Sequence, residues 1–190
     1  MILRGIFLLR RREIQWYYQE GASRMFPEAW QGFLAPIPEA ERDDMVSAYY
    51  RRLTSDDRKD RIAAARAWSM WEGGTSRLVP DSQLVARTGD ATFAEAFARI
   101  ECHYFINNGF FTDDNQLLDN VARIAHIPSI IVQGRYDVVC PPESAYLLHQ
   151  AWPSSELIIA GKSGHSALEP EITSHLVDAT IRFSAKTSGT

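Results

Sequence analysis

The chain has 190 residues, of which 45% are hydrophobic and 23% are charged, as in ordinary globular domains and unlike disordered or fibrous proteins. Its 20 basic and 24 acidic residues give a net charge of -4, so no surplus of positive charge is present to neutralise a phosphate backbone. Nucleic acid is therefore not expected as a partner.

The most apolar stretch near the start of the chain, residues 6–9, lies between charged residues at Arg4 and Arg10. It is far shorter than the roughly 20 apolar residues of a membrane span, and no small-residue cleavage site follows it as in a signal peptide. The two cysteines, Cys102 and Cys140, fit reduced thiols better than a disulfide framework. We therefore expect a cytoplasmic protein without membrane association.

The character of the residues divides the chain into three segments. The first, residues 1–12, contains an apolar stretch at 2–9 that is short and bounded by charge, which is typical of a buried parallel strand. The second, residues 13–123, is rich in aromatic residues and interrupted by prolines and glycines, which predicts several short helices. The third, residues 124–190, alternates between strand and helix patterns.

Three helices are predicted in the middle segment. The first covers residues 39–52, and the second is capped by Ser55, includes residues 67–71 and stops at Gly73. The third covers residues 91–107, where apolar side chains recur at helical spacing.

The last segment has predicted strands at 129–133 and 156–160 and predicted helices at 142–152 and 171–183. This order implies a parallel sheet with helices on its faces, because parallel neighbours need a crossover of a dozen or more residues. The helical middle segment is then an insertion between strands.

Two residues suited to catalysis follow these strands. In open α/β sheets, catalytic groups gather at the carboxyl ends of strands, and here Asp137 follows strand 129–133 while His165 follows strand 156–160. An Asp bonded to a His fixes the tautomer of the imidazole and stabilises the imidazolium formed when the His takes a proton from a nucleophile. The alternative is that Asp137 caps the turn before Pro141 and that His165 is an ordinary loop residue.

Residues 134–137 (Gly-Arg-Tyr-Asp) and 163–166 (Ser-Gly-His-Ser) resemble the acid and histidine motifs of proline iminopeptidases. The other segments that resemble this family, in matching order along nearly the whole chain, are residues 3–7, 18–23, 68–72 and 103–107. The resemblance implies an α/β hydrolase that removes an N-terminal proline with a serine nucleophile, with no cofactor. In that family, carboxylates of a helical cap hold the amino group of the substrate.

By this resemblance, Glu72 and Glu101 hold the amino group and Phe105 lines the pocket for the proline ring. The spacing supports the first assignment, because Glu72 lies four residues after Trp68 and Glu101 four after Phe97, on apolar helical stripes. An ionised carboxylate there is costly unless it meets a cation such as a substrate ammonium. The alternatives are an ion pair with a basic residue for each glutamate and core packing for Phe105.

The nucleophile of the family is a serine in Gly-x-Ser-x-Gly, a motif that these 190 residues do not contain. By the resemblance, Met1 falls at the start of the strand that follows the nucleophile helix. We therefore expect the C-terminal portion of an α/β-hydrolase fold, with about three parallel strands, flanking helices and a large helical cap inserted after the first strand. A truncated chain of this kind is expected to be inactive alone.

The function expected from these residues is that of a serine aminopeptidase acting on peptides with an N-terminal proline. A non-catalytic remnant or peptide-binding fragment is the main alternative, and another α/β hydrolase such as an esterase or epoxide hydrolase is a third. The paired glutamates favour the aminopeptidase, since an ester or epoxide has no amino group, and the histidines lack the His-Glu-x-x-His spacing of a metal site. An exposed sheet edge predicts self-association.

Overall fold

The computed structural model describes residues 1–187, which form two compact units. The α/β unit comprises Met1–Leu8 and the residues from Asn115 onward, and the helical unit comprises Leu9–Asp114. The boundaries thus lie after residues 8 and 114, whereas the sequence pattern placed them after residues 12 and 123.

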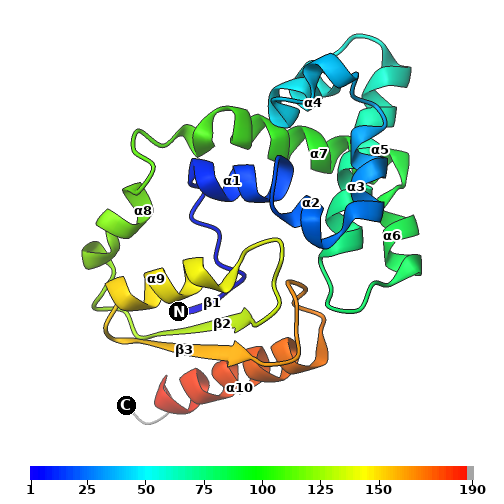
Figure 1. Cartoon of the computed structure of the whole chain (residues 1–190). Helices are drawn as coiled ribbons and strands as arrows, with labels where there is room; N and C mark the ends of the chain where they lie inside the picture. Colours follow the sequence, from blue (N-terminus) through cyan, green and yellow to red (C-terminus); the bar gives the residue numbers. More distant parts are fainter. Residues whose placement is uncertain (188–190) are drawn as a thin grey trace. The chain divides into compact units, whose positions relative to one another are not determined.

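Across the described residues, the α/β unit is built on a three-stranded parallel sheet in the order β1-β2-β3 (Figure 1). Its elements are β1 (Ile2–Arg4), α8 (Gln116–Asp119), η3 (Val121–Arg123), β2 (Ser129–Gly134), α9 (Pro142–Ala151), β3 (Ser155–Ala160) and α10 (Pro170–Thr187). The register pairs Leu3 with Ile131 and Ile131 with Leu157. The predicted alternation of strand and helix in the last segment is confirmed, with boundaries that differ by a few residues.

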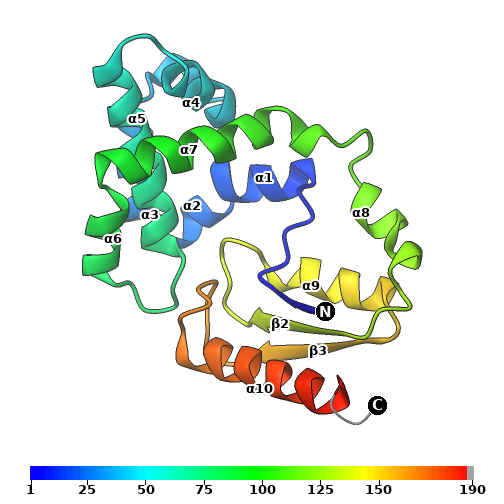
Figure 2. The ribbon, with the colours of Figure 1, turned by 180° about the vertical axis from the view of Figure 1, so that it is seen from behind.

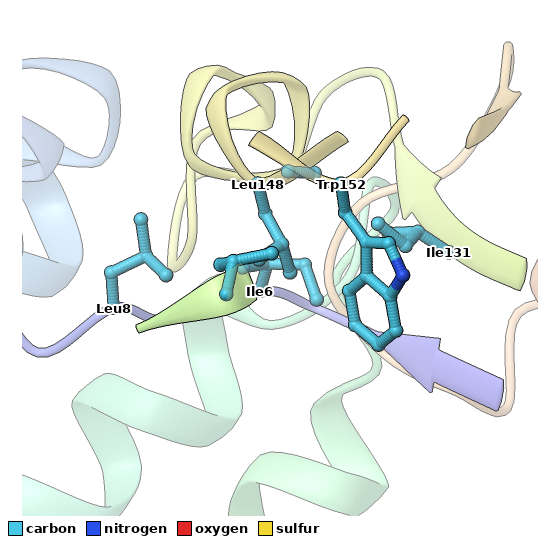
Figure 3. Close-up of a cluster of buried hydrophobic side chains, with 7 residues drawn as sticks. Ile6, Leu8, Ile131, Leu148 and Trp152 are labelled. Atoms are coloured by element: carbon cyan, nitrogen blue, oxygen red, sulfur yellow. The ribbon is translucent and has the colours of Figure 1, made fainter. Parts of the chain in front are cut away.

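Helices cover both faces of this sheet, because successive β2 side chains point to opposite sides. On one face, Ile131 packs with Leu148 of α9 and with Trp152 (Figure 3). On the other face, Val132 packs with Ile172 of α10. Apolar burial on both sides explains why all six residues of β2 are buried.

The first strand is shorter than residues 2–9, the length that the apolar run predicted. Pairing ends at Arg4 because Gly5 has a φ of +54°, in the left-handed region that favours glycine. Ile6 and Leu8 still lie in the core, on the chain that leaves the sheet (Figure 3). The hydrophobic pattern therefore identified buried residues correctly but overestimated the strand.

The helical unit contains α1 (Arg11–Tyr18), α2 (Ala22–Met25), α3 (Pro27–Leu34), η1 (Glu39–Glu41), α4 (Met45–Leu53), α5 (Arg58–Thr75), α6 (Ser82–Thr88), α7 (Ala91–Ile106) and η2 (Asn108–Phe110). The long helix α5 packs against α3, α4, α6 and α7 (Figure 2). Aromatic side chains fill its core, where the ring of Phe33 stacks on Tyr49 and Tyr18 stacks on Trp68. Among residues 1–187, no helix is long and apolar enough to cross a bilayer.

The predicted helix at 39–52 is interrupted. A 3-10 turn at Glu39–Glu41 is followed by α4, which begins at Met45 because the Asp44 side chain accepts a hydrogen bond from Ser47 N. An Asp at this position satisfies an N–H group that has no partner within the helix.

The second predicted helix, α5, is capped differently at both ends. Asp57 is its N-cap in place of Ser55, and accepts a hydrogen bond from Lys59 N. The helix also continues through Gly73, the residue expected to stop it. A Cβ at Gly73 would lie 2.5 Å from Thr88 Oγ1, so this glycine allows α6 to approach α5 closely. The third predicted helix is confirmed by α7 to within one residue.

Candidate active site

The loops that follow β2 and β3 lie side by side, which carries two distant parts of the sequence to one rim of the sheet. Tyr136 N donates a hydrogen bond of 3.0 Å to Ser163 O, so the parallel pairing extends past the ends of the strands. Gly134 makes the approach sterically feasible, because a Cβ there would lie 1.9 Å from Gly164 O. A side chain at this position would force the two loops apart.

These loops bring Asp137 and His165 into contact, as the strand-end argument predicted. His165 Nδ1 lies 3.0 Å from Asp137 Oδ2, and the carboxylate is fully shielded from solvent while the imidazole is 19% exposed. Asp137 also accepts hydrogen bonds of 2.8 Å from Cys140 N and from Gln133 Nε2. An ionised carboxylate is an acceptor only, and all of these partners can donate.

The surroundings of His165 set the roles of its two ring nitrogens. The bond to Asp137 places the proton on Nδ1, which leaves a lone pair on Nε2. Arg4 lies against this nitrogen, with Nη2 at 3.5 Å from Nε2, and its Nη1 donates to the His165 carbonyl oxygen. A guanidinium has no acceptor, so Nε2 faces a donor. The two contacts favour the tautomer that carries its proton on Nδ1 and leaves Nε2 as an acceptor.

Two glutamates at the start of α10 hold the histidine loop, and the sequence analysis missed both. Both carboxylate oxygens of Glu169 lie 3.0 Å from Gly164 N. Glu171 accepts bonds of 2.7 Å from Lys162 N and 2.9 Å from Gly161 N, and these backbone donors lower its pKa. Acidic residues next to Pro170, at the N-terminus of a helix, are a signal that could have identified them.

The helical unit contains the two predicted amine-binding glutamates, on α5 and α7. Glu72 accepts hydrogen bonds from Tyr18 OH and, at 3.2 Å, from Tyr17 OH. Glu101 Oε2 accepts a bond of 2.9 Å from Trp68 Nε1. In the part of the chain that the structure describes, no basic side chain forms an ion pair with either glutamate, so the ion-pair alternative is not observed there.

The environment of this pair favours the protonated carboxyl form. Burial raises the pKa of Glu101 to about 7, against a weaker lowering by the Trp68 donor. Burial, and then the charge of Glu101, raise the pKa of Glu72 well above its ordinary value. Burial followed by the charge of Glu72 also raises the pKa of Tyr17 and Tyr18, so these phenols remain donors. Two carboxylates in one poorly solvated cluster therefore retain a proton near neutral pH.

Phe105 lies in the same aromatic cluster. Its ring centroid is 5.1 Å from that of Tyr18 and 6.2 Å from that of Trp68, and the side chain is partly buried. Phe105 and Tyr18 also line a cavity of about 390 Å³ in the helical unit, together with Ile14 and Val46. Phe105 thus touches the aromatic residues that donate to both glutamates and also borders open space.

Comparison with known proteins shows the family to which the chain belongs. A family model described as TAP-like protein, of the α/β-hydrolase superfamily, matches residues 84–182, which is more than half of the chain. The chain belongs to the TAP-like family.

Relatives of this TAP-like chain carry the name proline iminopeptidase. A protein of Leptolyngbya boryana named probable proline iminopeptidase is 64% identical over 190 residues, covering 100% of the chain and 59% of the relative. The proline iminopeptidase of Xanthomonas citri is 60% identical over 96% of the chain and 58% of the relative, and that of Arabidopsis thaliana is 53% identical over 97% and 49%. The chain thus spans between 49% and 59% of the length of these relatives.

In this TAP-like chain, the residues singled out from the sequence fall into two groups, one in each unit. Asp137 and His165 are bonded directly, whereas Glu72, Glu101 and Phe105 are linked through shared aromatic neighbours. Besides Glu169 and Glu171, the sequence analysis missed the residues that bond to these two groups, namely Arg4, Tyr17, Tyr18, Trp68 and Gln133.

Proposed function

We propose that this TAP-like chain supplies the base, its orienting carboxylate and the amine-binding carboxylates of a proline iminopeptidase, a serine aminopeptidase that releases N-terminal proline from peptides. The observation that carries the proposal is the bond of 3.0 Å between His165 Nδ1 and buried Asp137, with Nε2 left as an acceptor. The names of the relatives, at 53% to 64% identity, support the same reaction class.

In the proposed reaction, His165 Nε2 takes the proton of a serine hydroxyl as the oxygen attacks the carbonyl carbon of the N-terminal proline itself. Asp137 keeps the proton on Nδ1 and stabilises the imidazolium. The same proton then passes to the leaving amine, and water completes the cycle by hydrolysing the acyl-enzyme. Since the 190 residues contain no Gly-x-Ser-x-Gly motif, the proposal assigns the nucleophile to polypeptide outside them.

We propose that the paired glutamates provide specificity for a free amino terminus. A substrate ammonium would supply the positive charge that this poorly solvated pair lacks, and would favour ionisation of both carboxyls. The phenol donors of Tyr17 and Tyr18 and the indole donor of Trp68 support the ionised form as well. An apolar proline ring beside Phe105 is the matching proposal for the side chain.

Complementation tests the function. The purified chain is mixed with a separately made nucleophile-bearing half of the Xanthomonas citri relative, and hydrolysis of a chromogenic proline amide is followed. We expect activity only in the mixture, and its loss with His165→Ala. Replacement of the exposed His126 by alanine is the matched control and should leave activity intact. Well-folded mixtures without any activity would favour a non-catalytic, peptide-binding role.

A second assay separates the aminopeptidase from an esterase. Glu72→Gln should raise KM for the free-amine proline amide, while hydrolysis of a simple aryl ester, which has no ammonium group, should change little. Equal losses on both substrates would argue against an amine-binding role for Glu72.

We also propose that the chain self-associates through the edge of its sheet. Within the described residues, β1 pairs with β2 on one side, which leaves backbone groups on its other side for another strand. Sedimentation velocity over a range of concentrations tests this, and a monomer throughout would refute it. We further propose a reducing compartment such as the cytoplasm, because the chain's two cysteines, Cys102 and Cys140, are both buried and form no disulfide with each other.

A further inference from the structure

Gln133 is a fully buried amide beside the Asp137–His165 pair. It is the fifth residue of β2 and is 0% exposed. Its Oε1 accepts a bond of 3.1 Å from Ile6 N, while its Nε2 donates to Asp137 Oδ2 at 2.8 Å and to Cys140 O at 2.9 Å. One side chain therefore joins the chain after β1, the orienting carboxylate and the end of the acid loop.

The chemistry of these partners requires an amide in one orientation. Both Nε2 hydrogens are used on oxygen acceptors, and Oε1 meets an N–H donor. A reversed amide would place Oε1 against a carboxylate and a carbonyl oxygen. An apolar residue of the same size would leave buried polar groups without this partner, which is unfavourable in the protein interior.

The bond to Gln133 also acts on the oxygen that His165 uses. Asp137 Oδ2 accepts from both Gln133 and His165, while Oδ1 accepts from Cys140 N. Donors on both oxygens fix the plane of the carboxylate. Loss of the Gln133 donor would allow Oδ2 to rotate away from the imidazole, since His165 reaches Asp137 through this single oxygen.

The same amide connects the two sides of the pair. Arg4 and Gly5, directly before Ile6, lie against the imidazole of His165, with a Cβ at Gly5 falling 3.0 Å from His165 Cε1. The bond from Ile6 N to Gln133 therefore fixes the backbone that contacts His165 relative to the side chain that holds Asp137.

We propose that Gln133 is a positioning residue, which holds Asp137 Oδ2 toward His165 Nδ1 and ties both to the segment that follows β1. The role rests on the proposed function of Asp137 and His165. The contact itself can be tested without catalysis.

The test uses proton NMR of the whole 190-residue chain. A proton shared between His165 Nδ1 and a carboxylate gives a resonance far downfield, which His165→Ala identifies by its disappearance. Gln133→Met, close in shape but without a donor, should abolish or shift this resonance. Ile131→Val on the same strand is the matched control, because it also perturbs a fully buried residue but has no bond to Asp137.

The outcomes are distinct. Loss of the resonance in Gln133→Met but not in Ile131→Val, at similar thermal stability, supports the positioning role. An unchanged resonance in folded Gln133→Met overturns it. If Gln133→Met does not fold, Gln133→Asn is measured instead, because it keeps an amide but shortens the side chain by one methylene group. Loss of the resonance then supports the positioning role, and an unchanged resonance overturns it.

The complemented enzyme provides a second readout. Gln133→Met should lower kcat by about 10- to 100-fold with little change in KM, as expected when a reacting group is displaced by a fraction of its contact distance. A rise in KM alone would oppose the proposal. If the wild-type mixture is inactive, the proposed function fails, while the NMR result still decides the role of Gln133.

Discussion

Replacement of Glu101 by glutamine should stabilise the chain at alkaline pH but not at acidic pH. Burial raises the pKa of Glu101 to about 7 from an ordinary value of 4.5. A carboxyl group whose folded pKa is raised stabilises the fold below its unfolded pKa. This contribution is lost as pH rises from 4.5 through about 7, because the folded state binds more protons in this window.

The size of the effect follows from the shift. At about 1.4 kcal/mol per pKa unit, the ionised carboxyl destabilises the folded state by about 3 kcal/mol relative to its protonated form. Glutamine carries no charge, and its oxygen can still accept from Trp68 Nε1. Its added N–H donors lack an established partner, which costs about 1 kcal/mol of the stability gained by removing the charge. The net stabilisation at about pH 8.5 is therefore about 2 kcal/mol.

Urea unfolding at about pH 5 and about pH 8.5, followed by tryptophan fluorescence, measures this difference. Four of the five tryptophans, Trp16, Trp30, Trp68 and Trp71, belong to the helical unit, so the signal reports mainly on that unit. With a slope of about 2 kcal/mol per molar urea, the transition midpoint of Glu101→Gln should exceed that of the wild type by about 1 M at the higher pH.

Glu95→Gln on the same helix is the control, because the pKa of Glu95 is lowered whereas that of Glu101 is raised. Glu95 Oε1 lies 2.6 Å from Arg61 Nε, and this hydrogen bond lowers its pKa. Its stabilising effect is present above the ordinary carboxyl pKa, so the substitution should not stabilise the chain at about pH 8.5. If Glu101→Gln and the wild type show the same change in midpoint between the two pH values, Glu101 does not retain a proton and the reasoning is wrong.

Three further substitutions or treatments follow from the same contacts. Trp68→Phe removes the indole donor and should raise the pKa of Glu101 above about 7, which carboxyl carbon NMR can follow. Gly5→Ala should destabilise the chain by about 1–2 kcal/mol and shift the imidazole signals of His165, because alanine disfavours the φ of +54° and its Cβ would meet the ring. Cys102 is fully buried, and burial is the main cause that raises its pKa to about 12, so iodoacetamide should not modify it in the native chain.

Each of these has a matched control. Trp30→Phe replaces an indole that does not donate to Glu101, so the pKa of Glu101 should not change. Gly32→Ala adds a Cβ with no atom within 4 Å and should be tolerated. Cys102 should react once urea unfolds the chain, and rapid modification without urea would contradict its buried environment.

Much of the chemistry of this protein is visible in local sequence patterns. The alternation of strands and helices after residue 124, with Asp137 and His165 each directly after a strand, is enough to predict that both lie at one rim of a parallel sheet. Similarly, Glu72 and Glu101 stand out because a carboxylate on an apolar helical stripe conflicts with its neighbours. These signals are local, since strand and helix periods need only a few consecutive residues.

The groups that hold these residues were not visible in the same way. Gln133 is a single polar residue in a buried strand, and Tyr17, Tyr18 and Trp68 have the pattern of core aromatic residues. Helix ends were also misjudged, because Ser55 and Asp57 are both acceptable N-caps and only the structure shows that Asp57 is used.

The sequence by itself determined the order of the elements after residue 124, and the residue types able to act as base, orienting carboxylate and amine ligands. Only the tertiary structure decided which donors meet them. Ile6 and Gln133 are separated by 127 positions, Trp68 and Glu101 by 33. Such bonds depend on how whole elements pack, because a hydrogen bond requires two atoms to meet within a few tenths of an ångström. The local propensity of a segment depends only on neighbouring residues, so it carries no information about that distance.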